Sequence, residues 1–234
     1  MNPIEIYADG PTIEEMEFFD QDIIKGYTFN PTLFRKLGVK DYLGHCRKVV
    51  ATSKGLPVSL EVIADSQDEM IRQARLLSAL GDNVFVKIPI TYTSGEPTLS
   101  VLKTLIWDGI NVNITAVFDE KQLLDIIPYL EGSNTIISVF SGRIFDIGLD
   151  AVESTREIAE LVHVWDNWGD CKVLWASPRM VYDINNAISA NCDIITMQPS
   201  LIKRLSLFGI TPEEYSLDTV QMFYNDAVSS GYVL

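Results

Sequence analysis

The sequence predicts a (β/α)8 barrel, a closed ring of eight parallel strands surrounded by helices, with an extra helix at the C-terminus. Strand-like and helix-like segments alternate along the chain at intervals of roughly 20–40 residues, which gives eight strand–helix units. The length of 234 residues suits a fold that usually takes about 250. Polar residues also recur late in the strands, where barrels place their active sites.

The first half of the chain predicts four strands, at 4–8, 26–29, 58–63 and 83–91. Helices are expected from 13 and over 31–37, 41–52, 65–80 and 97–107. Thr12 suits the N-cap of the first helix, and Asn30 followed by Pro31 suits the start of the second. Gly81 and Gly109 are placed to end helices.

The second half predicts strands at 111–117, 135–140, 172–176 and 193–197. Helices are expected over 120–130, 151–168, 178–190 and 199–208, and a last helix over 212–229. A doubly wound open sheet is the second choice, because it usually has fewer strands and no GxGxxG turn follows the first strand. Without a linker or low-complexity run, we expect one domain over 1–234.

Composition narrows the class of protein. With 18 basic and 32 acidic residues the formal net charge is −14, which argues against nucleic acid or an anionic membrane as a general partner. A small anionic substrate needs only a local pair of arginines. Three widely spaced cysteines (Cys46, Cys171, Cys192) and two histidines (His45, His163) give no metal-ligand spacing, so we expect no metal and no cofactor.

The same cysteine pattern favours a reducing compartment. The N-terminus lacks a basic region followed by an apolar run, and no apolar segment reaches membrane-spanning length. We therefore expect a cytoplasmic protein.

Lys87 stands alone in the apolar stretch NVFVKIPIT at 83–91. A buried ammonium is costly unless it is paired or its pKa falls, and a lysine with a lowered pKa is a nucleophile towards carbonyls. The alternative is a lysine whose stem is buried while its ammonium reaches water. The other strands favour the first interpretation.

Polar residues occupy inward-alternating positions late in six predicted strands. Singly, each suits a cap or a strand hydroxyl bonded to backbone. Together they predict one polar site, in which Glu61 would be the charge partner of Lys87. They are Asp9, Thr28, Asn30, Glu61, Lys87, Asn113, Thr115 and Ser138.

Beyond the sixth and seventh strands lie Arg143, in Ser-Gly-Arg, and Ser177 and Arg179, in Ser-Pro-Arg. Two arginines, a hydroxyl and the free N–H groups of a helix start suit a phosphate monoester, which barrels often bind near their last loops. The alternative for each arginine is a surface ion pair.

At this point the sequence resembles the small transaldolase family, which includes fructose-6-phosphate aldolases and consists of Schiff-base barrel enzymes. The resemblance spans essentially the whole chain. It rests on TFNPTL (28–33), SLEVIAD (59–65), NVFVKIPIT (83–91), INVNITAVF (110–118), SVFSGR (138–143), WASPR (175–179) and CDIITM (192–197).

The resemblance implies roles for individual residues. Lys87 would form the Schiff base with a ketose C2 carbonyl, and Asp9 would be the acid/base at the C4 hydroxyl. Glu61 and Thr115 would hold the water of imine formation. Asn30, Asn113 and Ser138 would bind the dihydroxyacetone part, and Arg143, Ser177 and Arg179 the phosphate. Residues 212–234 resemble the family's extra helix, which packs between subunits of a homo-oligomer.

Glu61 and Phe140 resemble the transferases of the family, whereas the aldolases tend to carry glutamine and tyrosine there. We therefore predict a transaldolase of the pentose phosphate type, acting on sugar phosphates. The alternatives are a lyase that releases dihydroxyacetone and a barrel that only binds sugar phosphate. The chain departs from the family pattern in Phe29, Val139 and Pro178, and the last bears on the position of Arg179.

Overall fold

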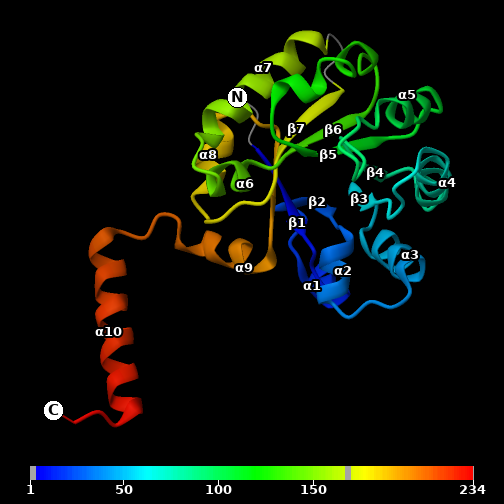
Figure 1. Ribbon diagram of the computed structural model, residues 1–234. Helices are drawn as coiled ribbons and strands as arrows, with labels where there is room; N and C mark the ends of the chain where they lie inside the picture. The colour runs from blue at the N-terminus through cyan, green and yellow to red at the C-terminus, as the bar shows by residue number, and fades with distance from the viewer. Residues whose placement is uncertain (1–3, 167–169, 234) are drawn as a thin grey trace. The chain divides into compact units, whose positions relative to one another are not determined.

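A computed structural model describes residues 4–166 and 170–233. Its contacts divide the chain into two compact units, Met1–Ile202 and Lys203–Leu234. In the first, eight parallel strands close into a barrel in the order β1 to β8 (Figure 1), which confirms the predicted fold. The strands are β1 (Glu5–Asp9), β2 (Ile24–Thr28), β3 (Val58–Glu61), β4 (Val84–Pro89), β5 (Val112–Val117), β6 (Thr135–Val139), β7 (Cys171–Trp175) and β8 (Ile194–Met197).

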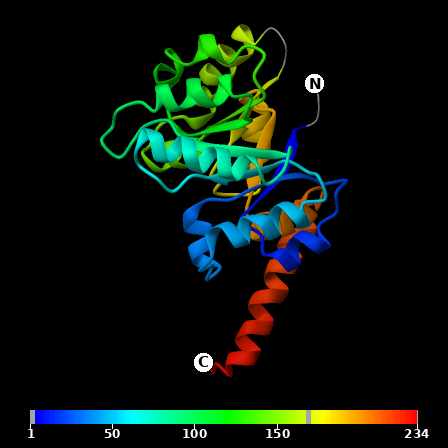
Figure 2. The same cartoon turned by 90° about the vertical axis from the view of Figure 1, so that its right-hand side faces the viewer.

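Helices surround the barrel, as the two views show (Figure 1, Figure 2). The α-helices of this unit are α1 (Ile13–Phe18), α2 (Pro31–Lys36), α3 (Tyr42–Thr52), α4 (Gln67–Ser78), α5 (Leu99–Trp107), α6 (Ser141–Asp146), α7 (Ala151–Trp165), α8 (Asp183–Ser189) and α9 (Pro199–Ile202). Of the helix predicted over 151–168, positions 167 and 168 lie outside the described residues. In no part of the chain that the structure describes is a helix long and apolar enough to cross a membrane.

Three helix predictions were wrong in part. Residues 120–130 form two 3-10 turns, η1 (Glu120–Leu123) and η2 (Ile127–Tyr129), because Pro128 has no N–H to continue an α-helix. The helix expected from 178 begins at Asp183, and the one expected over 199–208 is α only to Ile202. The short α6 was not predicted.

Side chains fill the barrel. Tyr7, Phe85, Ile136, Leu174 and Ile194 form a buried apolar cluster inside it, so the barrel is a packed core and not a pore. Gly26 leaves room for this packing, since a Cβ there would lie 2.6 Å from the Tyr7 ring. A floor of large side chains therefore separates the two ends of the barrel.

Strand β5 contains a bulge near its carboxyl end. Ile114 pairs with Ile137 and Val117 with Val139, so β5 has one residue more than β6 over this interval. Ala116 takes the left-handed conformation, with φ of 62°. This conformation costs a residue with a Cβ about 1–2 kcal/mol, and such bulges are frequent beside active sites.

The second unit contains the 3-10 turn η3 (Lys203–Leu207) and the predicted C-terminal helix, α10 (Pro212–Ser230). Thr211 and Glu214 form a capping box at its start, and Gly231 ends it with φ of 66°. No residue of α10 is buried. Its exposed apolar side chains include Leu217, Val220, Phe223, Tyr224 and Val228.

Candidate active site

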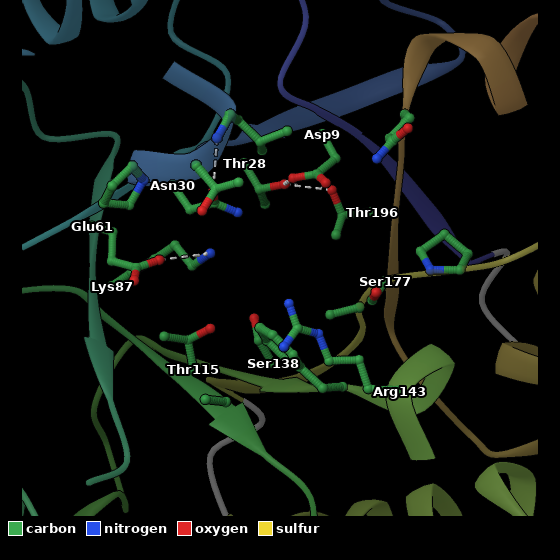
Figure 3. A pocket seen from close by; sticks show the side chains of 18 of the residues that line it. Asp9, Thr28, Asn30, Glu61, Lys87, Thr115, Ser138, Arg143, Ser177 and Thr196 are labelled. Atoms are coloured by element: carbon green, nitrogen blue, oxygen red, sulfur yellow. Dashed lines mark hydrogen bonds and ion pairs between the residues drawn. The ribbon is translucent and has the colours of Figure 1, made fainter. Parts of the chain in front are cut away.

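A cavity of about 450 Å³ opens at the carboxyl ends of the strands. Every predicted site residue except Asn113 lines it, and Figure 3 shows most of these side chains pointing into the same space. Thr28, which the sequence also predicted for this site, lines it as well, and four further polar residues line it that were not predicted: Thr32, Lys36, Thr196 and Gln198. Thr196 follows the rule that found the others, because it takes an inward position late in β8, two residues after Ile194.

Lys87 lies in β4 and is only 5% exposed. Its Nζ is 3.4 Å from Oε2 of Glu61, the last residue of β3, whose side chain is 19% exposed. The two residues are neighbours in the register of β3 and β4, which fixes them at one level of the barrel. Glu61 is therefore the charge partner that the sequence predicted for Lys87.

Asp9 ends β1 across the cavity mouth from this pair (Figure 3). Its Oδ1 accepts a hydrogen bond of 2.7 Å from the Thr28 hydroxyl, which lies 2.5 Å from the Thr196 hydroxyl. Burial raises the pKa of Asp9 above its ordinary value, and the Lys87 charge and the Thr28 bond oppose this only in part. A carboxyl with a raised pKa is suited to accept and return a proton near neutral pH.

Asn113 is fully buried and does not reach the cavity surface. Its Nδ2 donates to Ser59 Oγ at 3.0 Å, and its Oδ1 accepts from Ser138 Oγ at 2.7 Å. Because the Ser138 proton is used in this bond, the lone pairs of its oxygen remain to accept a hydrogen bond from a group in the cavity. Asn113 thus orients Ser138.

Thr115 is 2% exposed, and its hydroxyl has no hydrogen-bond partner among the described residues. Buried hydroxyls are almost always paired, so an orphan that lines a cavity indicates a place for a bound water or a ligand oxygen.

Asn30 caps α2, as predicted: its Oδ1 accepts from the Leu33 backbone N–H at 2.9 Å, and Pro31 begins the helix. The amide oxygen is used in the cap, so the amide NH2 group is the part of Asn30 that remains for a ligand.

Arg143 supplies a positive charge at the rim. Its guanidinium carbon lies 5.3 Å from the centre of the Phe140 ring, a cation–π contact that leaves the N–H groups free to bind. None of the described carboxylates forms a salt bridge with it. An unpaired, pre-positioned guanidinium suits an anionic ligand.

Arg179 also lines the cavity but is already paired. Its guanidinium contacts Asp146, and its Nε donates to the Gly142 carbonyl at 3.2 Å. Gly142 and Ser177 approach closely, because a Cβ on Gly142 would lie 1.6 Å from the Ser177 carbonyl oxygen. The chain at 177–179 is thus fixed against α6, and Arg179 has less charge to offer than Arg143.

The helix-start amides expected after Ser177 are not free. Asp183 is fully buried, and its Oδ2 accepts from the backbone N–H groups of Arg179 (2.6 Å) and Met180 (3.1 Å). Two of the backbone N–H groups that the sequence offered to a phosphate are therefore used within the protein.

The remaining ionisable candidates lie away from the cavity. His45 packs edge-on against Phe34, and His163 is bonded to Asp193. The three cysteines are free and buried. Among the residues described, no three His, Cys, Asp or Glu side chains are grouped as metal ligands.

A closed barrel with a lysine-centred polar cavity at its carboxyl end defines the class of protein: a (β/α)8 barrel with its site where barrel enzymes have theirs. The chain belongs to the transaldolase/fructose-6-phosphate aldolase family, which it matches over residues 6–231. It is therefore a transaldolase-type enzyme.

Relatives agree with this membership. The chain is 34% identical over 217 residues to a probable transaldolase of Thermus thermophilus, covering 89% of this chain and 93% of the relative. It is 33% identical over 210 residues to a probable transaldolase of Chelativorans, covering 89% and 91%. A solved monomeric variant of dihydrodipicolinate synthase shares the fold, with a TM-score of 0.60 and 11% identity over 85% of this chain and 69% of that one.

Proposed function

We propose that the protein is a transaldolase that moves a dihydroxyacetone unit from a ketose phosphate to an aldose phosphate through a Schiff base on Lys87. Suitable donors are sedoheptulose 7-phosphate and fructose 6-phosphate. The observation that carries the proposal is the burial of Lys87 beside Glu61 in a cavity that also contains Asp9 and Arg143.

In the first step the Lys87 amine adds to the C2 carbonyl of the ketose, and the carbinolamine loses water to form the imine. Glu61, 3.4 Å from Nζ, is placed to move protons between nitrogen and oxygen. The orphan hydroxyl of Thr115 is suited to hold the water.

In the second step Asp9 takes the proton of the C4 hydroxyl and the C3–C4 bond breaks. The electron pair moves to the iminium nitrogen, so an enamine remains on Lys87 and an aldose phosphate leaves. The raised pKa of Asp9 favours this proton uptake. Addition of the acceptor aldehyde reverses these steps, and Asp9 returns the proton.

Phe140 favours transfer over release. It lines the cavity without a hydroxyl that could protonate the enamine carbon, so the enamine persists until an acceptor arrives. The Asn30 amide NH2 and the Ser138 oxygen are placed to bind hydroxyls of the three-carbon unit.

Arg143 is the main phosphate ligand in this proposal, because its guanidinium is unpaired among the described residues. Arg179 and Ser177 complete the site from the neighbouring loop, which follows β7. A phosphate would compete with Asp146 for Arg179, which makes that contact the weaker of the two.

The proposal includes a homo-oligomer in the cytoplasm. A helix such as α10 with no buried residue gains little stability alone, so its apolar side chains call for a second copy of the chain. The free, buried cysteines suit a reducing compartment. Light scattering of the full chain and of Phe223→Asp tests the first point: the variant should fall to a smaller species.

The deciding experiment is reductive trapping. The protein is incubated with fructose 6-phosphate and borohydride, and the adduct is located by peptide mapping. An adduct on Lys87 supports the Schiff base, whereas adducts spread over surface lysines contradict it. Transfer to erythrose 4-phosphate without release of dihydroxyacetone in its absence separates a transaldolase from a lyase. A Lys87→Met variant that binds but does not turn over excludes a barrel that only binds.

A further inference from the structure

The hydrogen-bond ladder between β2 and β3 stops one step before the end of β3. The Tyr27 N–H donates to the Pro57 carbonyl at 2.8 Å, and the Phe29 N–H donates to the Ser59 carbonyl at 2.9 Å. The next donor in this parallel ladder, two residues on, would be residue 31 to the carbonyl of Glu61. Residue 31 is proline and has no N–H.

Tyr42 supplies the missing donor. Its hydroxyl donates to the Glu61 backbone carbonyl with an O···O distance of 2.5 Å, across 19 positions of sequence. Tyr42 is the first residue of α3, and Asp41 caps that helix. Its ring packs against Phe34 of α2 at 5.0 Å between centroids, so the phenol is held in place by the helix that Pro31 begins.

The hydrogen bond from Tyr42 fixes the backbone of Glu61, whose carboxylate lies beside Lys87. The next N–H along the chain, that of Val62, donates to the Lys87 carbonyl at 3.2 Å. The N–H groups of Ile63 and Ala64 then turn away from the sheet to the Gln73 side chain. Tyr42 therefore fixes the Glu61 peptide on the β2 side, opposite the side that β4 fixes.

Burial raises the pKa of the Tyr42 phenol above its ordinary range, so the hydroxyl remains a donor throughout the working range of pH. An unpaired carbonyl at this partly buried strand end would be unfavourable, and the strand end would shift to find a partner.

We propose that Tyr42 is a positioning residue for the reaction: its hydroxyl replaces the N–H that Pro31 removes and thereby sets the Glu61 carboxylate relative to Lys87. The inference rests on the proposed role of Glu61 in imine formation. Tyr42 does not line the cavity, so in this proposal it acts only through Glu61.

The test is Tyr42→Phe, which removes the hydroxyl and keeps the ring against Phe34. The rate of borohydride-trapped adduct formation on Lys87 with fructose 6-phosphate should fall by about tenfold, the equivalent of one lost hydrogen bond. Inhibition by inorganic phosphate should not change, because Arg143 is untouched. Tyr27→Phe is the matched control: Tyr27 is buried in β2, none of the described residues bonds its hydroxyl, and its variant should trap at the parent rate.

A double-mutant cycle with Glu61→Gln separates positioning from general loss of structure. If Tyr42 acts through Glu61, adding Tyr42→Phe to Glu61→Gln should slow trapping by less than twofold. A tenfold further loss in that background, or parent-like trapping by Tyr42→Phe alone, overturns the proposal. Failure of the proposed function has a different signature: the parent protein itself would form no adduct on Lys87.

Discussion

Among the described residues, the barrel strands contain two lysine–glutamate salt bridges, one at each end, and the one at the carboxyl end lines the cavity. At the carboxyl end Lys87 Nζ lies 3.4 Å from Glu61, and the two side chains are 6% and 19% exposed. At the amino end Lys172 Nζ lies 2.8 Å from Glu5, and the side chains are 40% and 36% exposed.

The shorter of the two contacts, between Lys172 and Glu5, is not the one that suits catalysis. Water screens the pair of Lys172 and Glu5, so its contribution is that of a surface ion pair. Lys87 and Glu61 lie in a region of lower dielectric, above the apolar side chains of the barrel core and beside a cavity. The same two residue types thus form a surface ion pair at one end of the barrel and the candidate catalytic pair at the other. The difference is that Lys87 and Glu61 are buried and line a cavity.

Replacing the lysine of each pair by methionine should have very different effects on activity. Lys87→Met should lower kcat by at least about 10³-fold, because it removes the buried amine that lies beside Glu61 and is proposed to form the imine. Lys172→Met, the matched change at the other end, should keep kcat within about twofold, since Lys172 does not line the cavity. Steady-state assays of transfer from fructose 6-phosphate to erythrose 4-phosphate measure both. A loss of activity in Lys172→Met with normal folding contradicts the distinction.

The two arginines that line the cavity should differ in their effect on substrate binding. Arg143→Ala should raise the KM for the ketose phosphate by about 10- to 100-fold, the value of a charge-assisted hydrogen bond to phosphate. Arg179→Ala should raise it by several-fold less, because that guanidinium is already paired with Asp146. Initial-rate measurements against substrate concentration give both values. Equal effects would mean that phosphate displaces Asp146 without cost.

Asp9→Asn should stabilise the fold near neutral pH while abolishing the proton transfer assigned to Asp9. The folded-state pKa of Asp9 is raised, so its contribution to stability is fully present below the unfolded pKa of about 4 and is lost as pH rises through the folded pKa. Removing the charge recovers that loss, on the order of a few degrees in Tm. Melting curves should converge for variant and parent towards pH 4; a lower Tm for the variant at pH 7.5 counts against the raised pKa.

The smallest effect belongs to the amino end. The hydrogen bond to Asp193 raises the pKa of His163, so its stabilising contribution is fully present below the unfolded pKa of about 6.5 and is lost as pH rises through the folded pKa. His163→Gln should lower Tm by about 1–3 degrees at pH 5.5 and by less at pH 8.5. His45, whose pKa burial lowers, is the control of opposite sign: its contribution is lost as pH falls.

The strands and most of the site could be predicted because period-two alternation and the carboxyl-end rule depend on local sequence alone. The same two rules predict from the sequence that Lys87 and Glu61 lie together. Thr196 obeys the same rule and was missed only because it stands alone late in β8. Pro128, which breaks the helix expected over 120–130, was equally visible in the sequence.

Contacts that cross between loops left no such pattern. The ion pair of Arg179 and Asp146 joins residues 33 positions apart, and no periodic sequence pattern predicts it. Asp183 falls inside the helix expected from 178, whereas it is the first residue of α8 and its buried carboxylate accepts from the N–H groups of Arg179 and Met180. Tyr42 and Asn113 contact the cavity residues Glu61 and Ser138. Tyr42 lies in a helix, so the search for polar residues at strand ends does not find it. Asn113 is found by that search, but the search cannot predict that it lies below the cavity surface.

The left-handed backbone of Ala116 affects which substitutions this chain can tolerate. Ala116→Gly relieves about 1–2 kcal/mol of strain in the native state and adds about 0.5–1 kcal/mol of unfolded-chain entropy, so it is near neutral or slightly favourable. The stability gained at this position, next to Thr115, could compensate for a destabilising substitution elsewhere on the cavity rim. A chain that carries Ala116→Gly should therefore tolerate a second substitution on the cavity rim of slightly greater stability cost than the present chain does.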